Sequence, residues 1–231
     1  NVAWRDVPLA ELLQRRTGLP AYATNDCHTA ALAEHLFGGG HASDALVVIN
    51  VGHGVGSGIV VKGQLLAGSP FGAGEIGHLV VDPGGDLCRC GNRGCLETVT
   101  GARGMARRAA RLGLPVPGDG SSGDGQEGLA WLQGLCEERN PQGLALVRET
   151  GRFLGRAAAS LVAVLGPCRI LFAGSVACFG EPLLAAVRDE MTARAFSTVS
   201  EKAEIGFVSV GADIVLRGAS VLVLSREMRL I

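Results

Sequence analysis

Three cysteines and one histidine form the clearest chemical signal in the sequence. Cys88, Cys90 and Cys95 lie within eight residues of one another, and His78 precedes the first of them by ten. Three thiols and an imidazole are the donor set of a closed tetrahedral zinc site, and glycines between the cysteines allow so short a loop to fold tightly. We therefore predict a structural zinc site here. The alternative is a cysteine-rich turn that binds no metal.

Two acidic residues flank this group of ligands. Glu75 lies three residues before His78, and Glu97 lies two residues after Cys95. A zinc site would bring both carboxylates toward one region, where they could accept hydrogen bonds from the hydroxyl groups of a polyol such as a sugar. Each also has an ordinary structural interpretation: Glu75 in a solvated loop, and Glu97 at the N-terminal end of a helix.

Asn25 and Asp26 lie at a predicted junction between a strand and a helix, where α/β proteins commonly bind ligands. An aspartate at this point could accept a proton from a hydroxyl group as a general base. Either residue could equally be the N-cap of the helix, a role that needs no ligand.

A glycine-rich segment, 52–58, links two apolar segments. Glycines such as Gly54 and Gly56 allow backbone N–H groups to approach a phosphate, but the segment is also compatible with a simple hairpin turn. No Lys-Ser or Lys-Thr pair follows, so it is not a P-loop. Gly174, directly after a later apolar segment, offers the same two interpretations.

Composition limits the function classes. The chain has 231 residues, of which 47% are hydrophobic and 19% charged, as expected for a globular domain. The net charge of −1 argues against a protein that mainly grips nucleic-acid phosphates. With no leader and no apolar run long enough to span a bilayer, we expect a cytoplasmic protein without a membrane partner. The chain begins at Asn1, so we expect it to be a fragment.

The remaining cysteines and histidines carry no ligand spacing. We predict four cysteines to be small buried residues in a reducing compartment: Cys27, Cys136, Cys168 and Cys178. We predict three histidines to be surface or helix-packing residues: His28, His35 and His41.

Hydrophobic periodicity predicts alternating helices and strands, and hence an α/β fold with helices on both faces of a sheet. The predicted helices are 7–16, 26–37, 97–112, 127–138, 142–165, 182–195 and 214–229. The predicted strands are 21–24, 45–51, 57–62, 65–67, 79–81, 169–173 and 204–210. Segment 113–125 lacks periodicity and is predicted to be a mobile surface loop.

Taken together, these motifs resemble the ROK family, which groups bacterial sugar kinases with sugar-responsive transcriptional regulators. The matching segments are 24–26, 52–58, 74–78 and 88–97, and their order and spacing agree along nearly the whole chain. The resemblance implies an actin-like ATPase (ribonuclease-H-like) α/β fold with a zinc-binding knuckle. On this view residues 1–231 form one sugar-binding and dimerisation domain.

The resemblance also implies roles for individual residues. The sugar contacts carry over to Asn25, Asp26, Glu75, His78 and Glu97, and the zinc ligands to His78, Cys88, Cys90 and Cys95. His78 would serve both sites, with one ring nitrogen on zinc and the other toward the sugar. In the kinases, the residue that matches Asp26 is the base that activates the sugar hydroxyl for attack on ATP.

Several departures from the family pattern decide which branch we predict. The N-terminal phosphate loop of the kinases is absent, His53 replaces the threonine of Gly-Thr-Gly, and Ser175 follows Gly174 where paired glycines are usual. His28 stands where asparagine is common, and segment 216–220 is similar to the regulators. We therefore predict the sugar-sensing effector domain of a ROK regulator, a homodimer or higher homo-oligomer that contacts DNA only through an absent N-terminal domain.

Two alternatives remain at this point. The chain could be an N-terminally truncated ATP-dependent kinase for a hexose or N-acetylhexosamine, with ATP and Mg²⁺ as cofactors and the nucleotide near Gly54, Gly56 and Gly174. It could also be a zinc-stabilised interaction module that binds no small molecule.

Overall fold

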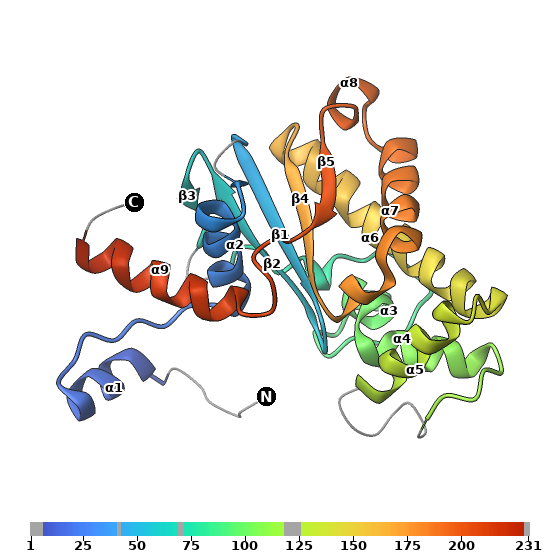
Figure 1. Ribbon diagram of the computed structural model, residues 1–231, viewed down its shortest axis with the longest axis horizontal. Helices are drawn as coiled ribbons and strands as arrows, with labels where there is room; N and C mark the ends of the chain where they lie inside the picture. The colour runs from blue at the N-terminus through green and yellow to red at the C-terminus, as the bar shows by residue number, and fades with distance from the viewer. Residues whose placement is uncertain (1–6, 41–42, 69–71, 118–125, 229–231) are drawn as a thin grey trace.

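A five-stranded sheet organises the molecule, and helices cover both of its faces (Figure 1). The computed structural model describes residues 7–40, 43–68, 72–117 and 126–228. The strand order is β3-β2-β1-β4-β5. The strands are β1 (Ala45–Val51), β2 (Val55–Val61), β3 (Gln64–Leu65), β4 (Arg169–Gly174) and β5 (Glu204–Phe207). β1, β2 and β3 pair antiparallel, whereas β1, β4 and β5 run parallel.

Strands β1 and β4 are apolar on both faces, which explains their continuous hydrophobic sequences. On β1, Val47 and Ile49 belong to one core cluster while Leu46 and Val48 belong to the other. β4 divides its side chains in the same way. The sheet therefore separates two cores, and the carboxyl ends of β1 and β4 lie side by side because Val51 is in register with Gly174.

One face of the sheet is covered by α2 (Asp26–Phe37) and α9 (Ile214–Met228), which pack against each other (Figure 1). The alanines of α2 allow close packing on β2, where a Cβ added to Gly58 would lie 2.1 Å from the carbonyl oxygen of Cys27. α1 (Leu9–Thr17) lies to one side and has no buried residue.

The other face carries the larger core and most of the helices. Its long helices α6 (Pro141–Leu165) and α7 (Gly180–Arg194) pack along each other. Around them lie α3 (Leu96–Thr100), α4 (Ala102–Arg111), α5 (Gln126–Glu137), α8 (Ser197–Ser200) and two short 3-10 helices, η2 (Ile76–His78) and η3 (Ser175–Phe179).

Three predicted elements differ in kind from those observed. Segment 21–24 forms no strand in the described part of the chain; it leads from α1 to α2 as irregular backbone. Segment 79–81 forms only an isolated bridge, between Val80 and Cys95. The helix predicted over 97–112 is two helices, because Gly101 is extended and the N–H of Ala102 donates to the carbonyl oxygen of Gly52.

The last strand is shorter than predicted for an identifiable reason. After Phe207, the N–H groups of Ser209 and Val210 donate to the buried carboxylate of Glu34 on α2, at 3.0 and 3.3 Å. Their hydrogen bonds therefore join this segment to α2 and do not continue a strand.

Other predictions concern exposure. His28 and His35 are buried in α2, as expected for packing residues, and His41 lies outside the described residues. All seven cysteines are free; Cys27 and Cys168 are buried as predicted, but Cys136 is only partly buried and Cys178 is exposed, contrary to prediction. Most of the loop predicted at 113–125 also lies outside the described residues. No helix in the described segments is long and apolar enough to cross a membrane.

Candidate functional site

The four predicted zinc ligands lie together. One donor atom each from His78, Cys88, Cys90 and Cys95 falls within 4.8 Å of all the others. The Sγ atoms of Cys90 and Cys95 are 3.6 Å apart, and Cys88 Sγ is 3.5 Å from His78 Nδ1. Two sulfur ligands of one tetrahedral zinc, each at about 2.3 Å from the metal, lie about 3.8 Å apart. The donor set and the spacing both fit zinc.

The backbone of the cysteine loop folds tightly to bring these atoms together. Cys88 N–H donates to the carbonyl oxygen of Asn92 at 2.7 Å, which closes a turn. Gly94 has φ +68°, and a Cβ there would lie 1.4 Å from the carbonyl oxygen of Asp82, so only glycine fits. Burial raises the pKa of the Cys95 thiol to about 12, so this thiol stays neutral unless a cation stabilises its thiolate.

Two glycines fix the backbone on either side of Glu75. A Cβ on Gly74 would lie 2.0 Å from the carbonyl oxygen of Ser57, and one on Gly77 would lie 2.0 Å from that of Val55. The N–H of Ser57 also donates to the carbonyl oxygen of Gly74 at 2.8 Å. The loop therefore packs directly onto β2, and Glu75 projects from it with its side chain 55% exposed.

Asn25 and Asp26 mark the start of α2. Asn25 is the N-cap, and its side-chain oxygen accepts a hydrogen bond from the N–H of Cys27 at 2.7 Å. The neighbouring carboxylate, that of Asp26, is exposed at the first helical position. Burial, followed by the charge of Asp26, raises the pKa of the Cys27 thiol to about 12, so this cysteine is no nucleophile.

The carboxylates and the amide converge on one cavity of about 470 Å³, which we call the acidic cavity. This volume is within the range of small-molecule sites, roughly 300–1,000 Å³. Of the predicted sugar contacts, four line it: Asn25, Asp26, Glu75 and Glu97. His78 does not line it, but its Nε2 lies 4.0 Å from Oε2 of Glu75, so the ring nitrogen that does not face Cys88 is directed toward Glu75.

Glu97 connects the cysteine loop to the acidic cavity. It lies in α3, two residues after Cys95, and its side chain is only 13% exposed. Its Oε1 accepts a hydrogen bond from Cys88 Sγ at 3.5 Å. The same oxygen forms an ion pair with Arg89, 3.3 Å from Nε. The cysteine loop therefore holds the Glu97 carboxylate through Cys88 and Arg89, as the flanking sequence suggested.

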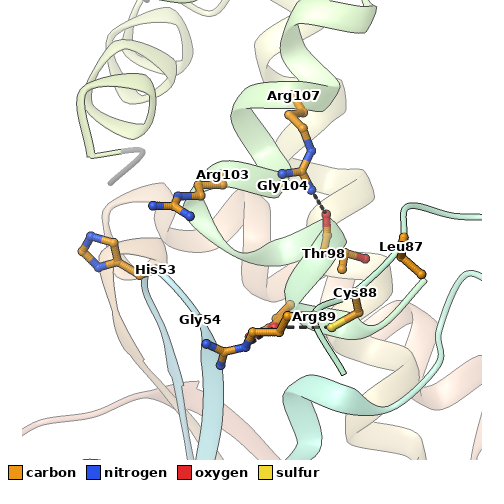
Figure 2. A pocket seen from close by; sticks show the side chains of 10 residues that line it. His53, Gly54, Leu87, Cys88, Arg89, Thr98, Arg103, Gly104 and Arg107 are labelled. Carbon is orange, nitrogen blue, oxygen red and sulfur yellow. Dashed lines mark hydrogen bonds and ion pairs between the residues drawn. The ribbon is translucent and has the colours of Figure 1, made fainter. Parts of the chain in front are cut away.

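A second cavity of about 620 Å³, the basic cavity, lies next to the first. It is lined by Arg89, Arg103 and Arg107, and it shares His53, Gly54, Arg89 and Glu97 with the acidic cavity. Figure 2 shows the Arg89 guanidinium beside Gly54, and Arg103 on the side of the cavity where His53 lies. Arg107 is held by Asp86 and by the carbonyl oxygen of Thr98, each at 3.3 Å.

The predicted nucleotide glycines lie close to these cavities. Gly54 and Gly56 line the acidic cavity, and Gly174 ends β4 beside the last residue of β1. The carboxyl ends of parallel strands are the usual ligand-binding edge of an α/β sheet.

Sequence reasoning missed three residues of the acidic cavity: Arg89, Asn50 and Cys27, the last of which was predicted only as a small buried residue. The position of Arg89 between two predicted ligands was a usable signal, because a tight loop must place it near Glu97. Asn50 gave no such signal, since it is one residue of a continuous apolar strand.

Comparison with known proteins gives consistent matches. The ROK family model matches residues 1–226. A glucokinase of Halalkalibacterium halodurans is 35% identical over 98% of this chain and 70% of its own length. The structure of a ROK family glucokinase from Streptomyces griseus in complex with glucose and AMPPNP is 31% identical, with a TM-score of 0.79 over 96% of this chain and 74% of that one.

A regulator is also similar. The structure of a ROK family transcriptional regulator, a homolog of the E. coli MLC protein, is 27% identical, with a TM-score of 0.76 over 93% of this chain. This chain spans 57% of that regulator. The structural likenesses confirm the predicted α/β fold and extend to both functional branches.

Proposed function

The chain belongs to the ROK family, and from that premise we propose that it is the sugar-binding effector domain of a ROK transcriptional regulator. In this proposal a hexose or a hexose derivative binds in the acidic cavity. The domain acts as a homodimer, and DNA is contacted by a separate part of the natural protein. A sugar can shift such a regulator only by binding one of its conformations more tightly than the other.

The observation that carries sugar binding is the convergence of Asn25, Asp26, Glu75 and Glu97 on one cavity. Carboxylates are strong acceptors for the hydroxyl hydrogens of a neutral polyol. Because the Asn25 side-chain oxygen already accepts from Cys27, its amide N–H groups are the part that would donate to a sugar oxygen. Glu97 would exchange its ion pair with Arg89 for sugar hydroxyls, or share the two.

We also propose that His78, Cys88, Cys90 and Cys95 hold a structural zinc ion. Bound there, zinc would cross-link η2 to the cysteine loop and so fix the positions of Glu75 and Glu97 relative to each other. All four positions of a tetrahedral site would be filled by protein atoms, which leaves no open position for catalysis.

The turn between β1 and β2 favours the regulator branch. The kinase pattern has threonine where this chain has His53, which lines both cavities. At the neighbouring strand end, the side chain of Ser175 donates to the carbonyl oxygen of Val51 at 3.3 Å. Both departures lie at the edge of the sheet where the family's nucleotide would bind.

A ROK sugar kinase is the second candidate, and Asp26 is the observation that favours it. This carboxylate lines the acidic cavity, where it could take the proton of a sugar hydroxyl as that oxygen attacks the γ-phosphate of ATP. The similarity to glucokinases over almost the whole chain supports the same candidate. In that case Mg²⁺-ATP would bind near Gly54, Gly56 and Gly174.

One experiment separates the candidates. The natural protein that carries this chain is titrated calorimetrically with glucose, N-acetylglucosamine and xylose, and each sugar is then incubated with it, ATP and Mg²⁺ while ADP is measured. We expect saturable binding of at least one sugar, with ADP release no faster than without sugar.

The opposite results are equally clear. Sugar-dependent ADP release that disappears in an Asp26→Asn variant would replace the regulator by the kinase. Binding of none of the three sugars, together with no sugar-dependent ADP release, would contradict both candidates.

A further inference from the structure

His28 is completely buried in the first turn of α2, and both of its ring nitrogens have polar partners. Nε2 lies 3.1 Å from the carbonyl oxygen of Ala73, and Nδ1 lies 3.3 Å from Oγ1 of Thr24. A carbonyl oxygen can only accept, so Nε2 must carry the hydrogen. In the imidazole tautomer with its hydrogen on Nε2, Nδ1 is an acceptor, and here it faces the Thr24 hydroxyl. The ring is therefore fixed in one tautomer and one orientation.

One of these contacts joins two of the segments that supply carboxylates to the acidic cavity, and the other holds the ring in place within the first segment. Thr24 and His28 flank Asp26 along the chain, whereas Ala73 lies two residues before Glu75. The hydrogen bond from His28 to Ala73 thus spans 45 residues of sequence and links the start of α2 to the loop that bears Glu75.

The Glu75 loop is attached to the rest of the site at three residues, Ala73, Gly74 and Gly77. His28 holds the carbonyl of Ala73, the N–H and hydroxyl of Ser57 donate to the carbonyl of Gly74 at 2.8 and 3.0 Å, and Gly77 packs against the Val55 carbonyl. The last two attachments fix the loop to β2. The first fixes it to α2, the helix that carries Asp26.

We propose that His28 is a positioning residue that sets the distance between Asp26 and Glu75 across the acidic cavity, and thereby the affinity for sugar. This inference rests on the proposed sugar-binding function. His28 does not line the cavity, so it acts through the start of α2 and the Glu75 loop and not by touching the ligand.

The test compares His28→Leu with His28→Gln. Leucine keeps an apolar side chain of similar size but removes both hydrogen bonds, whereas glutamine places an amide donor about as far from the backbone as Nε2. Amide hydrogen exchange over residues 73–78 reports on the loop, and calorimetric titration with the sugar that the wild type binds reports on affinity. Both are measured where each variant is fully folded.

We expect His28→Leu to increase exchange over residues 73–78 and to raise the Kd for sugar, each by about tenfold, which is the size of effect expected from one lost buried hydrogen bond. His28→Gln should recover most of both. A residue with a merely structural role would lower the unfolding midpoint and leave exchange in this loop and the Kd at wild-type values, and that result would overturn the proposal.

The outcomes also separate this proposal from the proposed function. If the wild type binds no sugar, the sugar-binding function is wrong, while the exchange data still decide whether His28 holds the Glu75 loop. If the wild type binds sugar and His28→Leu binds it equally well, the positioning role alone is wrong.

Discussion

Replacing Cys95 by serine is expected to remove zinc from the protein and to lower its free energy of unfolding by about 4 kcal/mol or more, as for other losses of a structural metal. Cys95 is fully buried, and its Sγ lies among the other donor atoms of the cluster, 3.6 Å from that of Cys90. It is also the residue before α3, so loss of the metal would loosen the helix that carries Glu97. Metal analysis and urea unfolding measure the two effects.

Cys178→Ser is the matched control. Cys178 is an exposed free cysteine outside the cluster, so this variant should keep about one zinc per chain. It should also keep the unfolding midpoint of the wild type. A wild-type protein that contains no metal and unfolds at the same midpoint after treatment with a chelator would contradict a structural zinc site.

The second large effect is expected for Asp26→Asn, which should weaken sugar binding by about 10- to 100-fold. The reason is the loss of a charge-assisted hydrogen bond to a sugar hydroxyl, worth about 1.5–3 kcal/mol. Stability should change little, because Asp26 is exposed and an asparagine oxygen can still accept from the N–H of Cys27, as Asp26 does at 2.9 Å. Calorimetric titration gives the Kd, and thermal unfolding gives the stability.

The control for this prediction is Asp189→Asn. Asp189 is an exposed aspartate on α7 and does not line the acidic cavity. The Asp189→Asn variant removes the same negative charge from the protein, but at a site away from the cavity. Its Kd for sugar should therefore equal that of the wild type. Equal sugar affinity in Asp26→Asn and wild type would remove Asp26 from the binding site.

Much of the fold could be predicted because its signals are local. The residues of segment 45–51 are mostly apolar, which predicts a buried strand. The segment from Asn25 to Phe37 begins with an N-cap and is rich in alanine, which predicts a helix. The break at Gly101 could not be predicted from the helical pattern around it. It depends on a hydrogen bond from Ala102 to Gly52, a residue 50 positions away. Segment 21–24 has strand-like residues, but a strand also needs a partner, and sequence alone does not supply one.

Part of the candidate site could likewise be predicted from local sequence, and part could not. The residue types and spacing of the cysteine loop were sufficient to predict a four-residue cluster, because short loops restrict where their side chains can lie. The convergence of Asp26 and Glu75 came from the family resemblance, since nothing local relates them. His28 was predicted only as a surface or packing residue, because its partner Ala73 is distant in sequence and contributes nothing but a backbone oxygen.

The most direct test of sugar binding in the acidic cavity is a crystal structure of the protein with the sugar that it binds in solution. We predict one sugar molecule in the acidic cavity, with hydroxyl groups within hydrogen-bond distance of Asp26 and Glu97. A sugar bound elsewhere, with these carboxylates in contact only with water, would contradict the account.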